Sequence, residues 1–272
     1  MGTPEEAKVR AARTYNAAAD HFDDPANTFW DHFGRRTIAG LNLGVGMRVL
    51  DVCCGTGASA IPAAEAVGPT GHVLGVDLAE NLLALGRAKA QQHNLSQLEF
   101  RAGDMLALDF PDSSFDTVVC VLGIFFVPDM EGAARELWRM VKPGGQLAIT
   151  TWGPRLLAPM DKVFWNAIRA ERPDLYRSFN PWDRIAEPSA LGSMLAGAGI
   201  PAPRIVPEDG LHPLPRPEAW WALALGSGYR ATLDQLDADS RERVRRANLD
   251  HLRQSGLTAV ETNAIYAVAT KP

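Results

Sequence analysis

Residues 47–57 read M-R-V-L-D-V-C-C-G-T-G, an apolar run of strand length that ends in a glycine turn. An alanine-rich stretch of helix length follows, and its Pro62 stands where only a first helical turn tolerates proline. From about residue 44 to residue 152, short apolar runs alternate with amphipathic stretches in the same way. This alternation predicts an α/β fold built around a parallel sheet.

The other elements follow from the same alternation. In the first part of the chain we expect strands at residues 72–77, 98–102, 115–122 and 146–152, and a helix at 80–92. After Trp152 the composition changes to proline, tryptophan and arginine, which we interpret as an insertion or cap. Beyond it we expect a strand at 204–208, helices at 217–225 and 238–254, and a closing strand at 262–270.

Composition limits what the protein can be. Of its 272 residues, 46% are apolar and 22% are charged, enough for the core and the wet surface of one elaborated domain. The formal charge of −5 argues against nucleic acid as a partner, because such binding relies on a basic face. The three cysteines and six histidines lack metal-ligand spacing, so we expect no metal and reduced thiols. We interpret Cys53 and Cys54 as buried small apolar groups.

The longest apolar run, residues 118–127, has half of the roughly 20 residues that a membrane-spanning helix needs. The first residues, M-G-T-P-E-E-A-K, are polar, with no apolar segment of a secretory signal behind them. We therefore predict no membrane span and a cytoplasmic location.

Acids and glycines follow the ends of successive predicted strands. Because the carboxyl ends of parallel strands meet at one edge of a sheet, this edge is where a ligand binds. Glycines let the backbone approach a ligand closely, and an acid about 20 residues later can accept hydrogen bonds from ribose hydroxyls. The residues are Asp51, the turn Gly55-Thr56-Gly57, Asp77, and Gly103 with Asp104.

Two ligands fit this pattern, since residues 55–60 also match the G-x-G-x-x-A fingerprint of dinucleotide-binding proteins. Asp51, four residues before the first glycine, would oppose a pyrophosphate but can help to order a loop around an ammonium-bearing ligand. Asp104 can accept a hydrogen bond from an adenine amino group. Both acids favour an adenosyl ligand that carries a positive charge.

The chain at this point resembles the class I S-adenosylmethionine-dependent methyltransferases, and more narrowly the ubiquinone/menaquinone-biosynthesis C-methyltransferases. The matching blocks are V-L-D-V-C-C-G-T-G, G-V-D-L-A-E-N-L, F-R-A-G-D-M, F-P-D-S-S-F-D-T-V-V-C and L-W-R-M-V-K-P-G-G-Q-L. The resemblance implies a Rossmann-like three-layer sandwich with a seven-stranded, mostly parallel sheet in the order 3-2-1-4-5-7-6. It divides the chain into an N-terminal helical lid (1–43), a cofactor-binding core (44–152), and an acceptor cap with the final strands (153–272).

The resemblance also implies positions for the cofactor S-adenosylmethionine. The glycine turn would line its methionine part, Asp77 would hold the ribose, Leu78 and Met105 would pack on adenine, and the backbone near Val121 would receive the ammonium group. The full set of cofactor-binding residues predicted in this way is Tyr15, Asp51, Gly55, Thr56, Gly57, Asp77, Leu78, Asn81, Gly103, Asp104, Met105 and Val121.

The acceptor side departs from the family pattern. Many relatives carry polar residues, such as two histidines, just after the fourth strand, where this chain reads Ile124-Phe125-Phe126-Val127 and offers no base. This apolar wall suggests a hydrophobic or aromatic acceptor, with a plain strand exit as the alternative. Six aromatics are candidates for acceptor binding, and two histidines are candidates for a general base. The aromatics are Phe22, Trp30, Phe125, Phe126, Trp152 and Trp182, and the histidines are His21 and His212.

The sequence thus predicts a small-molecule methyltransferase that uses S-adenosylmethionine, with transfer to carbon, oxygen or nitrogen left open. Alignment of the reacting atoms and exclusion of water would supply most of the catalysis. A nicotinamide-dependent oxidoreductase and a non-catalytic S-adenosylmethionine-binding protein are the alternatives. We expect a monomer or a dimer.

Overall fold

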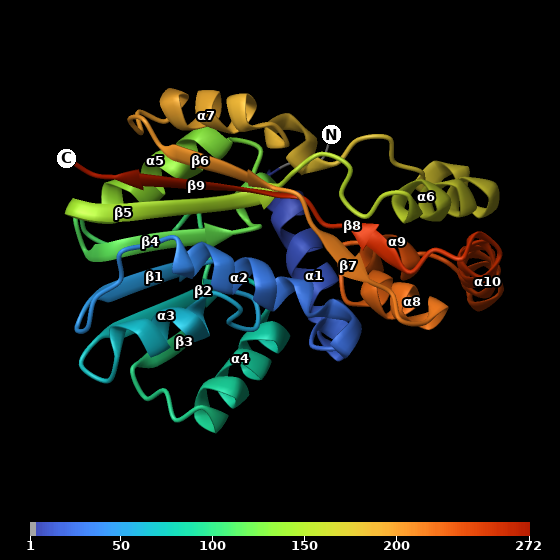
Figure 1. Ribbon diagram of the computed structural model, residues 1–272, viewed down its shortest axis with the longest axis horizontal. Helices are drawn as coiled ribbons and strands as arrows, with labels where there is room; N and C mark the ends of the chain where they lie inside the picture. Colours follow the sequence, from blue (N-terminus) through green and yellow to red (C-terminus); the bar gives the residue numbers. More distant parts are fainter. Residues whose placement is uncertain (1–3) are drawn as a thin grey trace.

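The computed structural model describes residues 4–272 and contains one seven-stranded sheet in the order β3-β2-β1-β4-β5-β9-β6 (Figure 1). Since β9 is the seventh strand of this sheet along the chain, the predicted order 3-2-1-4-5-7-6 is confirmed. β9 runs antiparallel to both of its neighbours, whereas β1 to β5 are parallel. The strands are β1 Arg48–Val52, β2 His72–Asp77, β3 Leu98–Ala102, β4 Phe115–Val121, β5 Val141–Trp152, β6 Arg204–Glu208 and β9 Ala264–Thr270.

Helices cover both faces of the sheet because its central strands are apolar on both sides. Val49, Val119 and Ala148 face the same way and pack with α3 (Ala60–Val67). Their sequence neighbours face the opposite way and pack with α5 (Met130–Met140), as the two-residue period of a strand requires. The other elements on the sheet are α2 Phe29–Ala39, α4 Glu80–Gln92, α7 Pro188–Gly197 and the 3₁₀ turns η2 Ile124–Phe126 and η4 Pro181–Ile185, and a further 3₁₀ turn, η1 Pro25–Asn27, packs against α8.

A helical region lies beyond the carboxyl ends of the strands, and we call its elements the cap (Figure 1). It includes a small two-stranded sheet, β7 with β8, that the sequence analysis did not anticipate. No helix within residues 4–272 has the length and hydropathy needed to cross a membrane. The cap consists of α6 Met160–Glu171, η3 Pro173–Leu175, β7 Leu211–Pro213, α8 Pro217–Leu225, α9 Arg230–Leu233, α10 Ala238–Ser255 and β8 Ala259–Glu261.

The first helix, α1 (Pro4–Phe22), lies between the sheet and the cap, across the carboxyl ends of the strands (Figure 1). We call it the lid helix. It packs against α4 of the core and against α8 and α9 of the cap. One long helix therefore touches both halves of the molecule at the edge where a ligand is expected.

Several strand boundaries differ from those predicted, and β4 ends at Val121 rather than at residue 122. β5 begins at Val141 rather than at Gln146, because Val141 pairs with Phe115 before the register shifts at the K-P-G-G turn. The closing strand, β9, begins at Ala264 rather than at Thr262, and the short strand β8 (Ala259–Glu261) precedes the predicted segment. The strand at 204–208 and the helix at 217–225 have the predicted bounds.

Candidate functional site

A cavity that opens to solvent lies where the carboxyl ends of β1 to β4 meet the lid helix. Its wall is mostly apolar, with a few polar groups, as is typical of small-molecule sites. The structure brings twelve residues predicted for the site to this wall. They are Tyr15, Phe22, Trp30, Gly55, Thr56, Asp77, Leu78, Gly103, Asp104, Met105, Val121 and Phe126.

The glycine turn after β1 is shaped by left-handed backbone conformations at Gly55 (φ 54°) and Gly57 (φ 92°). A Cβ on Gly57 would stand 2.9 Å from the Phe100 ring, so this glycine, which lies outside the cavity wall, serves the packing of the turn. A Cβ on Gly55 would come no closer than 3.7 Å to the Phe22 ring. At Gly55 the requirement for glycine therefore comes from the backbone angle.

Asp77 ends β2 and holds the glycine turn in place. Its Oδ2 accepts a hydrogen bond from the Gly55 amide, and its Oδ1 accepts one from the Ala79 amide, both at 2.9 Å. Burial raises the pKa of Asp77, and these amides partly offset that rise because they stabilise the charged form. Each carboxylate oxygen keeps a second lone pair for a ligand in the cavity.

Asp51 lies beneath the turn and is fully buried, outside the cavity wall. Its Oδ2 accepts a hydrogen bond from the Ser59 hydroxyl at 2.7 Å, and Ser59 does line the cavity. Burial raises the pKa of Asp51 to about 7. This geometry supports a role for Asp51 in ordering the loop after β1. It does not place Asp51 in direct contact with a ligand in the cavity.

Asp104 is already engaged by the lid helix. Its Oδ2 lies 3.2 Å from Lys8 Nζ, and its Oδ1 accepts a hydrogen bond from the Leu106 amide at 2.9 Å. Lys8 also pairs with Glu5, and both side chains line the cavity. This pair was not predicted from the sequence, although Lys8, Ala12 and Tyr15 recur at helical spacing in the lid helix and line the same wall.

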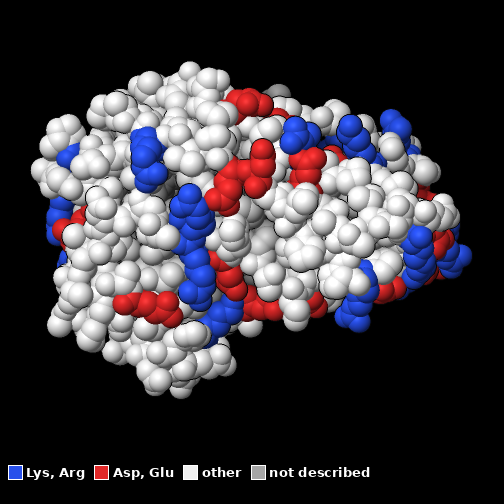
Figure 2. Space-filling model, viewed as in Figure 1, with Lys and Arg blue, Asp and Glu red and all other residues white. Residues whose placement is uncertain are grey.

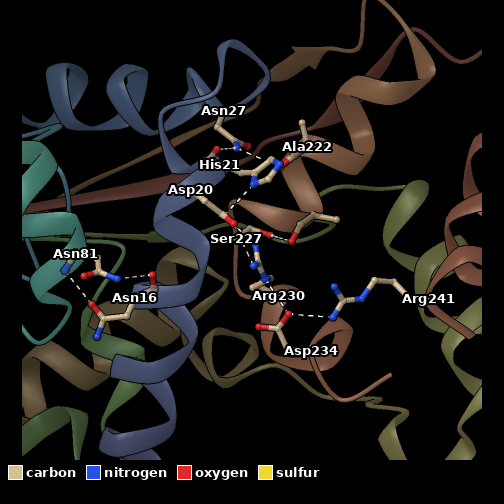
Figure 3. Close-up of polar contacts among 11 residues, drawn as sticks. Asn16, Asp20, His21, Asn27, Asn81, Ala222, Ser227, Arg230, Asp234 and Arg241 are labelled. Carbon is tan, nitrogen blue, oxygen red and sulfur yellow. Dashed lines mark hydrogen bonds and ion pairs between the residues drawn. The ribbon is translucent and has the colours of Figure 1, made fainter. Parts of the chain in front are cut away.

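The lid helix is tied to the core at two further points. Asn81, predicted for the cofactor, lies outside the cavity wall, where its amides donate to Asn16 Oδ1 (2.8 Å) and to Asn16 O (3.0 Å) (Figure 3). Just beyond the helix, Asp23 accepts a hydrogen bond from the Thr56 hydroxyl at 3.1 Å. The glycine turn and α4 are thus both bonded to the segment that covers the cavity.

The cap is tied to the same helix by Arg230. Its guanidinium donates to both carboxylate oxygens of Asp20, at 2.9 and 3.2 Å, and also to Asp234 (Figure 3). His21, one of the two predicted bases, lies at this junction, with Nδ1 2.8 Å from Asp20 Oδ1 and no place in the cavity wall. Its position between two elements of the scaffold gives it no access to a ligand in the cavity.

His212, the other predicted base, is also outside the cavity wall. It lies on β7, with Nε2 2.7 Å from the Ala26 carbonyl oxygen and its ring edge against Phe29. Burial lowers the pKa of His212, so its neutral form is favoured and fastens the cap to the core. No histidine of the described chain lines the cavity.

Aromatic side chains form one end of the cavity. Tyr15 meets Phe126 edge to face at a centroid distance of 5.5 Å, and Phe22 stacks on Trp30 at 5.1 Å. Burial raises the pKa of Tyr15 far above its ordinary value, so its hydroxyl stays protonated and can donate a hydrogen bond.

Three aromatics predicted for acceptor binding lie outside the cavity wall. Phe125 and Trp152 are buried in the core, and Trp182 packs on Phe125 at 5.5 Å. Phe125 and Phe126 are consecutive in the turn η2, which directs the first into the core and the second to the cavity. Periodicity did not separate the two because the local backbone is not a regular strand.

The chain is similar in sequence to known methyltransferases. A family profile described as "Methyltransferase domain" matches residues 49–145. A demethylmenaquinone methyltransferase of Listeria welshimeri is 46% identical over 123 residues, which cover 45% of this chain and 51% of the relative. One from Oceanobacillus iheyensis is 36% identical over 162 residues, 58% of this chain and 68% of the relative.

The chain thus spans about half the length of the Listeria relatives that it matches. Among solved structures, that of the [4+2]-cyclase SpnF superposes with a TM-score of 0.60 over 97% of each chain, at 18% identity. At this identity the likeness concerns the fold.

Proposed function

The chain belongs to the class I S-adenosylmethionine-dependent methyltransferase family, in its menaquinone-methyltransferase branch, and from this premise we propose that it methylates an apolar or aromatic small molecule. The observation that carries the proposal is the joint position of Asp77, the glycine turn and the aromatic end on the wall of one cavity. A nicotinamide-dependent oxidoreductase has no comparable support.

The residues present fit S-adenosylmethionine. Asp77 offers lone pairs to the ribose hydroxyls, and the turn at Gly55 lies on the same cavity wall. Leu78 and Met105 are apolar walls at the ends of β2 and β3, where adenine would pack. Asp104 would accept from the adenine amino group beside its contact with Lys8.

When bound, S-adenosylmethionine supplies an electrophilic methyl carbon on a sulfonium. The protein's part is to align the acceptor with that carbon and to exclude water. Tyr15, Phe126 and Trp30 form the apolar end where an acceptor ring would lie, covered by the lid helix. The Tyr15 hydroxyl, held protonated by burial, would donate a hydrogen bond to an acceptor oxygen.

We propose that the acceptor brings its own nucleophile. The ionisable side chains on the cavity wall, within the part of the chain that the structure describes, include no histidine and no free base at the aromatic end. A phenol or a reduced quinone ring has a nucleophilic oxygen and nucleophilic ring carbons once it loses a proton to water. A quinone-like acceptor is therefore our first candidate, as the name of the demethylmenaquinone relatives also suggests.

The choice of acceptor is expected to depend on the cap. The family profile ends at residue 145, before any element of the cap begins. We do not propose nucleic acid as the acceptor, since the net charge is −5 and basic and acidic side chains are interspersed on the face shown in Figure 2.

The test has two parts. Calorimetry with S-adenosylmethionine, S-adenosylhomocysteine and NADH should show binding of the first two only. Methyl-labelled S-adenosylmethionine should then transfer label to a reduced naphthoquinone lacking its ring methyl, and Tyr15→Phe should lower kcat more than it raises KM. NADH binding without S-adenosylmethionine binding would favour the oxidoreductase. Binding without transfer to any component of a cell extract would favour a non-catalytic protein.

A further inference from the structure

Two of the three cysteines approach each other at the floor of the cavity. Cys53 is the first residue after β1, and Cys120 belongs to the neighbouring strand β4. Both sulfur atoms lie beside Gly123, since a Cβ on that glycine would stand 2.8 Å from Cys53 Sγ and 3.1 Å from Cys120 Sγ. The glycine leaves the space in which the two thiols meet.

The strand register gives the backbone separation that a disulfide needs. Val52 pairs directly with Cys120 in the parallel ladder, so Cys53 is one residue beyond this pair. Neighbouring strands are about 4.8 Å apart and rise about 3.3 Å per residue, which puts the two Cα atoms roughly 6 Å apart. Disulfides form with Cα atoms at about 4.4 to 6.8 Å.

The backbone of Cys53 is left-handed, with φ 60°, a conformation that is uncommon outside glycine. A regular strand would send consecutive side chains to opposite faces, but here Cys53 and Cys120 pack in the same hydrophobic cluster. Cys54 packs in the cluster on the opposite face, where its sulfur would meet a Cβ on Gly75 at 2.9 Å. Only one of the adjacent cysteines can therefore reach Cys120.

Cys53 is also the thiol of this pair that a small oxidant can reach, because it lines the cavity whereas Cys120 is fully buried. The contact with Cys120, together with burial, raises the pKa of Cys53 well above its ordinary value. Since the thiolate is the reactive form, oxidation at neutral pH should be slow, and the thiols should survive mild exposure.

From this geometry we propose that Cys53 and Cys120 are a dithiol site that peroxide converts to a disulfide, weakening ligand binding in the cavity. Hydrogen peroxide transfers one oxygen to the Cys53 sulfur, which becomes a sulfenic acid, and its other oxygen leaves as water. The Cys120 sulfur then displaces the hydroxyl, which takes the Cys120 proton and leaves as a second water. The two thiols lose two electrons and two protons, the O–O bond breaks, and one S–S bond forms.

Binding weakens because Cys53 leads into the ligand-holding turn. The next amide, Cys54 N, donates to Val76 O at 3.2 Å, and Gly55 N donates to Asp77. Drawing Cys53 Sγ to the bonding distance of about 2 Å from Cys120 pulls on both hydrogen bonds. The carboxylate proposed to hold the ribose would lose its alignment with the turn.

The test compares the wild-type protein with three variants after long exposure to peroxide. The number of free thiols in the denatured protein should fall from three to one, and the intact mass should fall by two hydrogens. Peptide mapping should link Cys53 to Cys120. Cys54→Ala is the matched control and should still form the bond, whereas Cys53→Ala and Cys120→Ala should not. The pairing would be overturned by three remaining thiols, by a bond to Cys54, or by disulfides that only join separate chains. Peptide mapping of the oxidised wild-type protein distinguishes these outcomes even if a variant does not fold.

Calorimetry with S-adenosylhomocysteine tests the consequence. Oxidised wild-type protein should bind at least 5-fold more weakly, and a dithiol reductant should restore the affinity. Equal affinity before and after oxidation would refute the effect on the cavity. If the reduced protein does not bind S-adenosylhomocysteine, the proposed function fails while the disulfide result stands on its own.

Discussion

The replacement Asp77→Asn tests the centre of the proposed site. The side chain keeps its shape, but the charge is lost and one of the two oxygens becomes an amide nitrogen. In the native protein these oxygens accept the Gly55 and Ala79 amides at 2.9 Å while facing the cavity. The asparagine can therefore no longer accept both amides and also two ligand hydroxyls.

Hydrogen bonds to a charged group contribute about 1.5 to 3 kcal/mol, and each 1.4 kcal/mol changes an affinity about tenfold. We therefore expect Asp77→Asn to weaken S-adenosylhomocysteine binding by about 10- to 150-fold in isothermal titration calorimetry. An amide N–H left without an acceptor should also lower the free energy of unfolding by about 1 to 3 kcal/mol. Urea denaturation of the same samples separates the two effects.

Asp116→Asn is the matched control. Asp116 also accepts a backbone amide, that of Arg48 at 2.8 Å, and it pairs with Lys142, but it lies at the opposite end of the strands, outside the cavity wall. This variant should keep its affinity for S-adenosylhomocysteine. If Asp77→Asn folds and binds as tightly as the native protein, the assignment of the ribose site is refuted.

Three further predictions concern the scaffold. Gly57→Ala should lower the free energy of unfolding by about 2 kcal/mol more than Gly144→Ala does. Both glycines have positive φ, but only a Cβ at residue 57 would meet neighbouring atoms, so equal losses in urea denaturation would contradict this prediction. The raised pKa of Asp51, about 7, makes the folded state bind a proton that the unfolded state releases near pH 4, so this group's contribution to stability is lost as the pH rises from about 4 to 7. Asp51→Asn should remove that loss, so the free energy of unfolding of the variant relative to that of the native protein should rise by on the order of 2 kcal/mol from pH 5 to pH 8. If this difference does not change with pH, the native carboxyl does not titrate in that range. Arg230→Met should cost about 1 kcal/mol, since Arg230 is only 14% exposed and bonds two carboxylates, whereas Arg253→Met, in an exposed pair, should change the unfolding midpoint little.

The sheet and most of the proposed cofactor side of the site could be predicted from the sequence alone. Strand-length apolar runs separated by amphipathic stretches allow little besides a parallel sheet, and a parallel sheet brings all its carboxyl ends to one edge. The acids and glycines at those ends, Asp77 and Gly55 among them, were therefore placed together without coordinates, and the structure puts both on the cavity wall.

Which aromatic and basic side chains reach that cavity depends on the three-dimensional packing of the chain. The choice between Phe125 and Phe126 depended on a 3₁₀ turn, and the exclusion of His21 and His212 depended on how the lid helix and the cap dock on the core. Such contacts join residues far apart in the chain, as between Asp20 and Arg230, where sequence spacing carries no information about distance. Local periodicity records which face of an element is apolar, whereas the partner that covers this face is chosen by packing in three dimensions.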